Sequence, residues 1–101
     1  MDKENLSFLV CCANGGGTSL MCKMSLQRAL DKLGIKPKKL HHCALAEGKS
    51  SATRFDVVFC PRTFEGMFAS AKEKGTIVIG LRNVMSSQEI EEKMREFGLA
   101  D

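Results

Sequence analysis

Short apolar runs alternate with helical patterns along the chain. Residues 6–12 form a continuous apolar run that stops just before three glycines, which predicts a buried strand. Similar runs predict strands at residues 39–45, 56–60 and 76–81. The run at 39–45 is the least hydrophobic of the four, so we expect it at an edge of the sheet.

Helical periodicity fills most of the gaps between these runs. An apolar stripe at helical spacing predicts a helix over residues 18–33, closed by Gly34. Residues 46–54 are polar and are expected to form a loop with at most one helical turn, and a short amphipathic helix is expected before Gly75. Ser86 and Glu89 have capping-box spacing and begin a last predicted helix. The apolar positions of these three helices are Cys22, Leu26, Ala29, Leu30 and Leu33, then Phe64, Met67, Phe68 and Ala71, then Ile90, Met94 and Phe97.

This alternation predicts an α/β fold. Nearly unbroken apolar strands indicate a parallel sheet that is covered on both faces. Right-handed crossovers then give an open four-stranded parallel sheet with helices on both faces, a flavodoxin-like, Rossmann-like three-layer sandwich. The whole chain, residues 1–101, is expected to be one domain. Ligands of such sheets bind beyond the carboxyl ends of the strands, near the switch point.

The loop after the first predicted strand has the chemistry of an anion site. Three glycines let successive N–H groups converge on one point, and the following helix adds its free first-turn donors. A cysteine at the rim of such a site is favoured as a thiolate and can attack phosphorus. We therefore predict Cys12 as a nucleophile in front of a phosphate-binding loop made of Ala13, Asn14, Gly15, Gly16, Gly17, Thr18 and Ser19.

The composition adds a redox argument and a charge asymmetry. With 44% hydrophobic and 27% charged residues, the chain is expected to fold rather than be disordered. Its five cysteines are odd in number and lack Cys-x-x-Cys spacing, which favours reduced thiols in a cytoplasmic protein over a disulfide framework. Basic residues concentrate in residues 18–54, where they form a modest positive patch.

The segment CANGGGTS, at residues 12–19, resembles the loop of the IIB components of bacterial sugar phosphotransferase systems, and the ascorbate- and galactitol-type branches match best. Ala13 stands where these proteins often have glycine. Later segments are also similar to the ascorbate branch, namely Cys43-Ala44 with Glu47 and Lys49-Ser50, and Gly80-Leu81-Arg82-Asn83.

The resemblance implies a phosphoryl relay. A IIA protein that carries a phosphohistidine would pass its phosphoryl group to Cys12, and the phosphocysteine would donate it to a sugar, L-ascorbate or galactitol, bound in the membrane permease IIC. It implies no metal and no other cofactor. It also implies a cytoplasmic protein that is peripheral to the permease when docked and does not itself insert into the membrane.

The other candidate side chains receive more modest assignments. Cys11, Cys22 and Cys60 are expected in the core, as is Met24. Met21, Arg62 and Arg82 are candidate partner contacts, because Met21 follows the loop and each arginine follows a predicted strand. The adjacent histidines, His41 and His42, point to opposite faces of a strand and do not have the spacing of a zinc site.

Three rival functions stay open at this point. A low-molecular-weight phosphatase or arsenate reductase also places Cys-x5-Arg-Ser after its first strand, but Thr18 replaces that arginine here and Asp56 opens a strand at the wrong end of the sheet for a general acid. A non-catalytic, regulatory anion-binding module would use the same loop. A nucleic-acid binder would rest on the basic residues alone, without Trp or Tyr for stacking, and we do not expect nucleic acid as a partner.

Overall fold

We describe a computed structural model of the chain over residues 6–12, 16–83 and 86–99, without the side chains of residues 12 and 16–19. Four parallel strands form one sheet in the order β2-β1-β3-β4, which confirms the predicted flavodoxin-like sheet. The strands are β1 (Ser7–Cys12), β2 (Lys39–Ala44), β3 (Val57–Pro61) and β4 (Ile77–Leu81). β2 is an edge strand, as its composition predicts.

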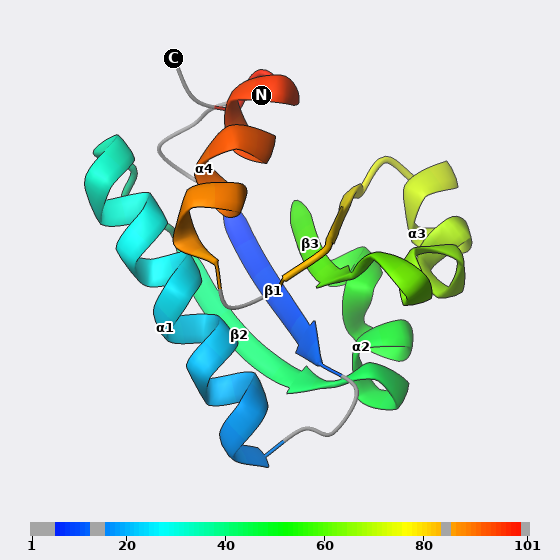
Figure 1. The fold of residues 1–101 in the computed structure, drawn as a ribbon. Coiled ribbons are helices and arrows are strands. Elements are labelled where there is room, and N and C mark those ends of the chain that lie inside the picture. Colours follow the sequence, from blue (N-terminus) through cyan, green and yellow to red (C-terminus); the bar gives the residue numbers. More distant parts are fainter. Residues whose placement is uncertain (1–5, 13–15, 84–85, 100–101) are drawn as a thin grey trace.

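Helices cover both faces of the sheet. α1 (Gly16–Leu33) and α4 (Ser87–Glu96) lie on one face, and α2 (Leu45–Ser51), η2 (Arg62–Phe68) and α3 (Ala69–Glu73) lie on the other (Figure 1). Gly34 ends α1 with a φ of 74°, a left-handed conformation that glycine adopts without strain. The predicted three-layer architecture is therefore present.

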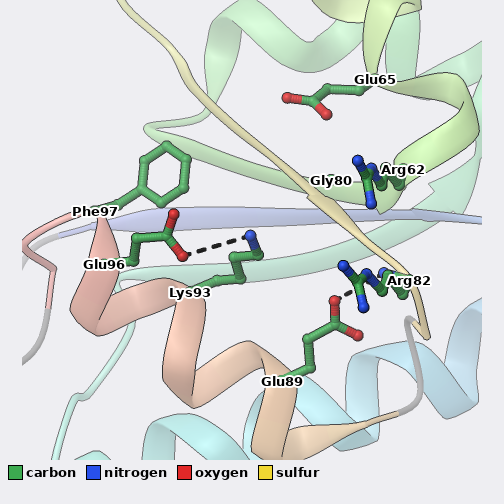
Figure 2. Close-up of a pocket in the computed structure, with 8 residues that line it drawn as sticks. All are labelled: Arg62, Glu65, Gly80, Arg82, Glu89, Lys93, Glu96 and Phe97. Carbon is green, nitrogen blue, oxygen red and sulfur yellow. Dashed lines mark hydrogen bonds and ion pairs between the residues drawn. The ribbon is translucent and has the colours of Figure 1, made fainter.

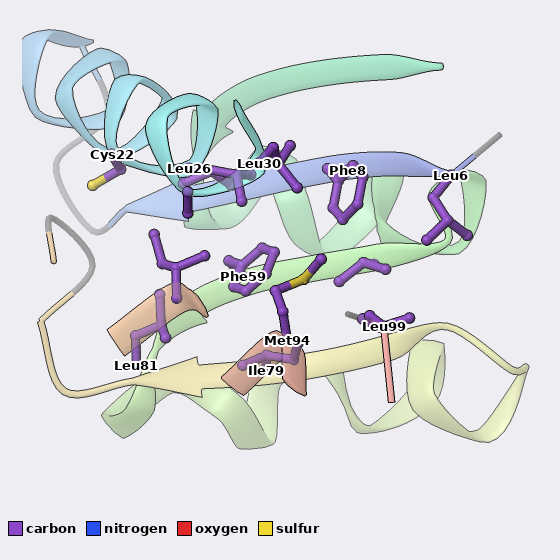
Figure 3. Close-up of a cluster of buried hydrophobic side chains, with 14 residues drawn as sticks. Leu6, Phe8, Cys22, Leu26, Leu30, Phe59, Ile79, Leu81, Met94 and Leu99 are labelled. Carbon is purple, nitrogen blue, oxygen red and sulfur yellow. The ribbon is translucent and has the colours of Figure 1, made fainter. Parts of the chain in front are cut away.

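The core is divided by the sheet into two apolar clusters. Under α1 and α4, Phe8 and Phe59 stack at 6.3 Å between ring centroids, and Leu26 and Met94 from the two helices pack over them (Figure 3). The prediction that Phe97 belongs to the buried stripe of the last helix is wrong, because its side chain is 44% exposed. Leu99, beyond the turn at Gly98, is buried in its place, because the chain reverses there and returns to the sheet.

The second cluster accounts for a helix that the sequence does not predict. Residues 46–54, expected to be a loop, instead form most of α2 and the short η1 (Ala52–Arg54). Leu45 and Ala52 are buried against the sheet, and Gly48 lies so close to Cys11 that a Cβ atom there would overlap the Cys11 sulfur. Three small or apolar residues among polar ones are enough to pack a short helix on the sheet. They are too few to show helical periodicity in the sequence.

Asp56 connects β1 and β3 at the amino end of the sheet. Its carboxylate accepts hydrogen bonds from the backbone N–H and the hydroxyl of Ser7, at 2.8 and 3.1 Å. The Ser7 hydroxyl in turn accepts from the Asp56 N–H at 3.1 Å. Asp56 thus fixes the start of β1, at the end of the sheet opposite to Cys12.

Candidate functional site

Cys12 is the last residue of β1 and pairs with Ala44 of β2. β1 lies between β2 and β3 in the sheet. The connection through α1 places β2 on one side of β1, and the connection through α2 places β3 on the other side. The carboxyl end of β1 is therefore the switch point of the sheet. Three residues, Ala13, Asn14 and Gly15, separate Cys12 from the start of α1 at Gly16 and lie outside the described residues.

α1 presents its amino terminus at this switch point. Its 18 residues give it a full helix dipole, and its first turn contains no acidic residue that would neutralise the positive end. The backbone of Gly16, Gly17, Thr18 and Ser19 forms that first turn. Strand end, short connection and helix start therefore have the arrangement in which backbone N–H groups bind an anion.

Three other cysteines are inert packing residues. Cys11 and Cys60 are fully buried, and Cys43 is 6% exposed. Burial raises the pKa of Cys11 far above the ordinary range, and the nearby Cys43 raises it further. Burial also raises the pKa of Cys43, and raises that of Cys60 to about 12. None of the three is a thiolate at neutral pH, so none is a competing nucleophile.

Cys22 is fully buried in the core under α1, as predicted. It is disulfide-bonded, however, which corrects the expectation that all five cysteines are reduced. The odd number of cysteines argues only against complete pairing, and sequence spacing does not show which sulfur atoms the fold brings together. The chemistry considered below therefore refers to the protein under a reductant.

Arg62 and Arg82 lie at the carboxyl edge of the sheet, as predicted. Arg62 follows β3, one strand from β1, and Arg82 follows β4, two strands away, which is about 10 Å at the usual strand spacing. Both line a hollow of about 320 Å³ beside β4, between η2 and α4 (Figure 2). Carboxylates share this hollow with them, so it is a mixed-charge surface; its other lining residues are Glu65, Gly80, Glu89, Lys93, Glu96 and Phe97.

Glu89 organises the chain where β4 leads into α4. Its two carboxylate oxygens accept hydrogen bonds from the backbone N–H groups of Arg82 and Asn83, at 2.8 and 2.9 Å. The Ser86 hydroxyl accepts from the Glu89 N–H at 3.2 Å, which confirms half of the predicted capping box. The other half differs, because the Glu89 carboxylate binds the end of β4 instead of the Ser86 N–H. Capping-box spacing could not reveal this second partner.

The outer face of α1 differs from the prediction. Met24, expected in the core, is 49% exposed, and Met21 and Leu20 are 55% and 47% exposed. The buried stripe of the helix already passes through Cys22, Leu26 and Leu30, which turns Met24 outward. Ser25 takes the boundary position, where its hydroxyl donates to the Met21 carbonyl at 3.1 Å.

The two adjacent histidines, His41 and His42, lie on β2. His41 is exposed and stacks on Phe55, with ring centroids 6.2 Å apart. Across the described ranges, His, Cys, Asp and Glu side chains form no group of three that could hold a metal ion. No helix in those ranges is long and apolar enough to cross a bilayer.

The comparisons with known proteins agree with this geometry. A family model described as "PTS system, Lactose/Cellobiose specific IIB subunit" matches residues 8–96. The chain belongs to the PTS IIB family. It is therefore a IIB component of a sugar phosphotransferase system, a phosphotransferase that works with IIA and IIC components.

Relatives of this IIB protein share its length. The ascorbate-specific EIIB component of Mycoplasma pneumoniae is 25% identical over 93% of this chain and 96% of its own. Its counterparts in Salmonella typhimurium and Escherichia coli O157:H7 are each 28% identical, over 87% of this chain and 84% of theirs. The lactose-specific IIB domain of Streptococcus pneumoniae has the same fold, with a TM-score of 0.66 at 18% identity over 91% of this chain and 96% of its own.

Proposed function

We propose that Cys12 is the residue of this IIB protein that carries the phosphoryl group. The observation that carries the proposal is the place of Cys12 at the carboxyl end of β1, separated by three residues from the amino terminus of α1 at the switch point of the sheet. The inertness of Cys11, Cys43 and Cys60 supports it, since their raised pKa values leave them protonated at neutral pH.

The proposed relay has two balanced steps. In the first, the Cys12 thiolate attacks phosphorus on the phosphohistidine of IIA; the S–P bond forms, the P–N bond breaks, and the released imidazole nitrogen takes up a proton. In the second, a hydroxyl oxygen of the sugar in IIC attacks phosphorus; the O–P bond forms, the S–P bond breaks, and Cys12 leaves as a thiolate. The hydroxyl proton passes to a base or to water.

The phosphate loop stabilises the transferring group in both steps. We assign this role to the backbone N–H groups of Ala13, Asn14, Gly15, Gly16 and Gly17 and to the hydroxyls of Thr18 and Ser19. Donors fixed by a helix start need no reorganisation when charge develops on the phosphoryl oxygens, and the dipole of α1 adds to their effect. Cys12 benefits in the same way, because an anion is favoured there over a neutral thiol.

The transported sugar is proposed to be L-ascorbate. The relatives that cover most of the chain carry the ascorbate-specific name, and no residue described in this protein distinguishes ascorbate from galactitol. Arg62 and Arg82 are proposed to meet acidic groups of the partner proteins, because they stand at the carboxyl edge of the sheet, one and two strands from β1. Residues 1–101 are proposed to act as one cytoplasmic IIB domain that docks on the permease.

A reconstituted relay tests the proposal. The protein, under reductant, is mixed with phosphorylated ascorbate-type IIA and with vesicles that contain an ascorbate-type or a galactitol-type IIC, and the sugar phosphate is measured. We expect ascorbate phosphate with the ascorbate-type permease and none when Cys12→Ser replaces the wild type. Rapid hydrolysis of an aryl phosphate, without transfer to either sugar, would establish a phosphatase instead.

A further inference from the structure

The outer face of α1 carries an unusual group of apolar side chains. Four large hydrophobic side chains among the described residues are exposed, and Leu20, Met21 and Met24 account for three of them within five positions of one helix. Lys23 and Arg28 border them. We call these five residues the α1 patch.

The fold does not require apolar residues at these positions. The inner stripe of α1 already supplies the side chains that pack on the sheet, and polar residues would serve equally well on the outer face. Contiguous exposed apolar groups instead mark interaction sites, and methionine suits them because its flexible thioether adapts to different surfaces.

The patch is also shaped for contact. A hollow of about 320 Å³ is lined by Leu20, Lys23 and Met24 together with Gln27 and Arg28. A second hollow of about 180 Å³ lies beside it and shares Met24 and Arg28. Met24 and Arg28 therefore line both hollows, which together can receive apolar side chains of a partner.

Its position links the patch to the proposed phosphoryl carrier. Residues 20–28 extend along the helix for about 12 Å, starting one turn after the helix begins at Gly16. A protein that covers the patch therefore lies beside the carboxyl end of β1, where Cys12 ends the strand. Docking here would bring a group on the partner's surface to Cys12.

The charge of the patch distinguishes between the two partners. Lys23 and Arg28 are basic, and the first acidic residue of α1 is Asp31, on its last turn. The cytoplasmic loops of membrane proteins carry an excess of lysine and arginine, so they would be repelled by this face. An apolar surface surrounded by carboxylates complements it, and such a surface is expected on a cytoplasmic protein partner.

We propose that the α1 patch is the docking surface for the phosphohistidine-carrying IIA protein, and that it meets a face of IIA that is apolar with acidic residues around it. This inference rests on the proposed function, because it takes the phosphoryl donor as the partner. It adds that IIA and the permease dock on parts of the protein surface that differ in charge.

The test pairs patch variants with matched controls. Met21→Gln/Met24→Gln removes apolar surface while keeping a good helix former, and Phe97→Gln removes exposed apolar surface at the C-cap of α4. Arg28→Glu reverses a charge in the patch, and Lys72→Glu makes the same change on exposed α3. Two quantities are measured for each: the Kd for unphosphorylated ascorbate-type IIA by titration, and the initial rate of phosphorylation of the protein against IIA concentration.

We expect both patch variants to raise the Kd and the KM for IIA about tenfold with an unchanged maximal rate, and both controls to match the wild type. Added salt should weaken the wild type more than Arg28→Glu. Equal values in patch and control variants would overturn the docking surface, as would normal donor kinetics combined with slow transfer to the permease. Patch-dependent binding without any phosphorylation would support the docking surface and overturn the proposed function.

Discussion

The sulfur atoms of Cys11 and Cys43 lie 3.7 Å apart on the paired strands β1 and β2. Both thiols are buried in the apolar layer under α2, and burial raises the pKa of each; Cys43 raises the pKa of Cys11 further, whereas the contact with Cys11 partly offsets the rise at Cys43. Cys11 is thus held as a packing residue beside Cys12, the proposed nucleophile, and the two adjacent cysteines should differ sharply in reactivity.

Alkylation of the folded, reduced protein measures that difference. At neutral pH, we expect iodoacetamide to modify Cys12 first, and Cys11, Cys43 and Cys60 only at the rate at which the protein opens, because a buried protonated thiol does not react. Peptide mapping by mass spectrometry at successive times identifies each site. Early modification of Cys11 or Cys60 in protein that is still folded would contradict this assignment.

The buried thiols also predict how stability depends on pH. The pKa of Cys60 rises from 9.0 to about 12 on folding, so the unfolded chain releases this proton above pH 9 while the native protein keeps it. Stability from this group is complete below pH 9 and is lost as the pH rises toward 12. The loss should be steeper in the wild type than in Cys60→Ala, by about 1.4 kcal/mol per pH unit above pH 9, as urea unfolding at several pH values would show. Parallel pH profiles for the two proteins would be inconsistent with a buried protonated thiol.

Gly48 should be intolerant of even one methyl group. A Cβ atom there overlaps the Cys11 sulfur, so Gly48→Ala is expected to lose about 1–3 kcal/mol of unfolding free energy through overpacking. Gly66→Ala, where a Cβ meets nothing within 4 Å, is the control and should change stability little. Combining Gly48→Ala with Cys11→Ala should recover part of the loss, and additive effects in this double-mutant cycle would show that the two residues do not touch.

Glu89 should stabilise the connection between β4 and α4 more than an ordinary surface glutamate. Its carboxylate accepts two backbone hydrogen bonds, and in Glu89→Gln one amide oxygen replaces two charged acceptors. We expect a loss of about 1–2 kcal/mol in urea unfolding. Glu92→Gln, an exposed change on the same helix, serves as the control. Equal stability of the two variants would mean that the two hydrogen bonds accepted by Glu89 contribute nothing to the free energy of unfolding.

Periodicity and local chemistry in the sequence predict most of the fold. The apolar runs gave all four strands, and the stripe from Cys22 to Leu30 gave α1, because burial on one side of a regular element leaves a regular pattern. Periodicity does not predict α2, because this seven-residue helix contains a glycine and is held by contact with Cys11 rather than by an apolar stripe of its own.

The candidate site is predictable in one part and not in another. The place of Cys12 at a strand end and the helix that follows the glycines could be predicted, since these signals are local in sequence. The outward turn of Met24, the exposure of Phe97 and the two backbone partners of Glu89 depend on tertiary packing. The disulfide at Cys22 likewise depends on the fold and not on cysteine spacing.

Mass analysis after phosphorylation shows directly whether Cys12 carries the phosphoryl group. The reduced protein is incubated with phosphorylated ascorbate-type IIA, and intact-mass analysis is followed by peptide mapping. We predict one added phosphoryl group on Cys12, which persists in Cys60→Ala and is absent from Cys12→Ser. A phosphoryl group on any other residue, or its undiminished appearance in Cys12→Ser, would show that Cys12 is not the carrier.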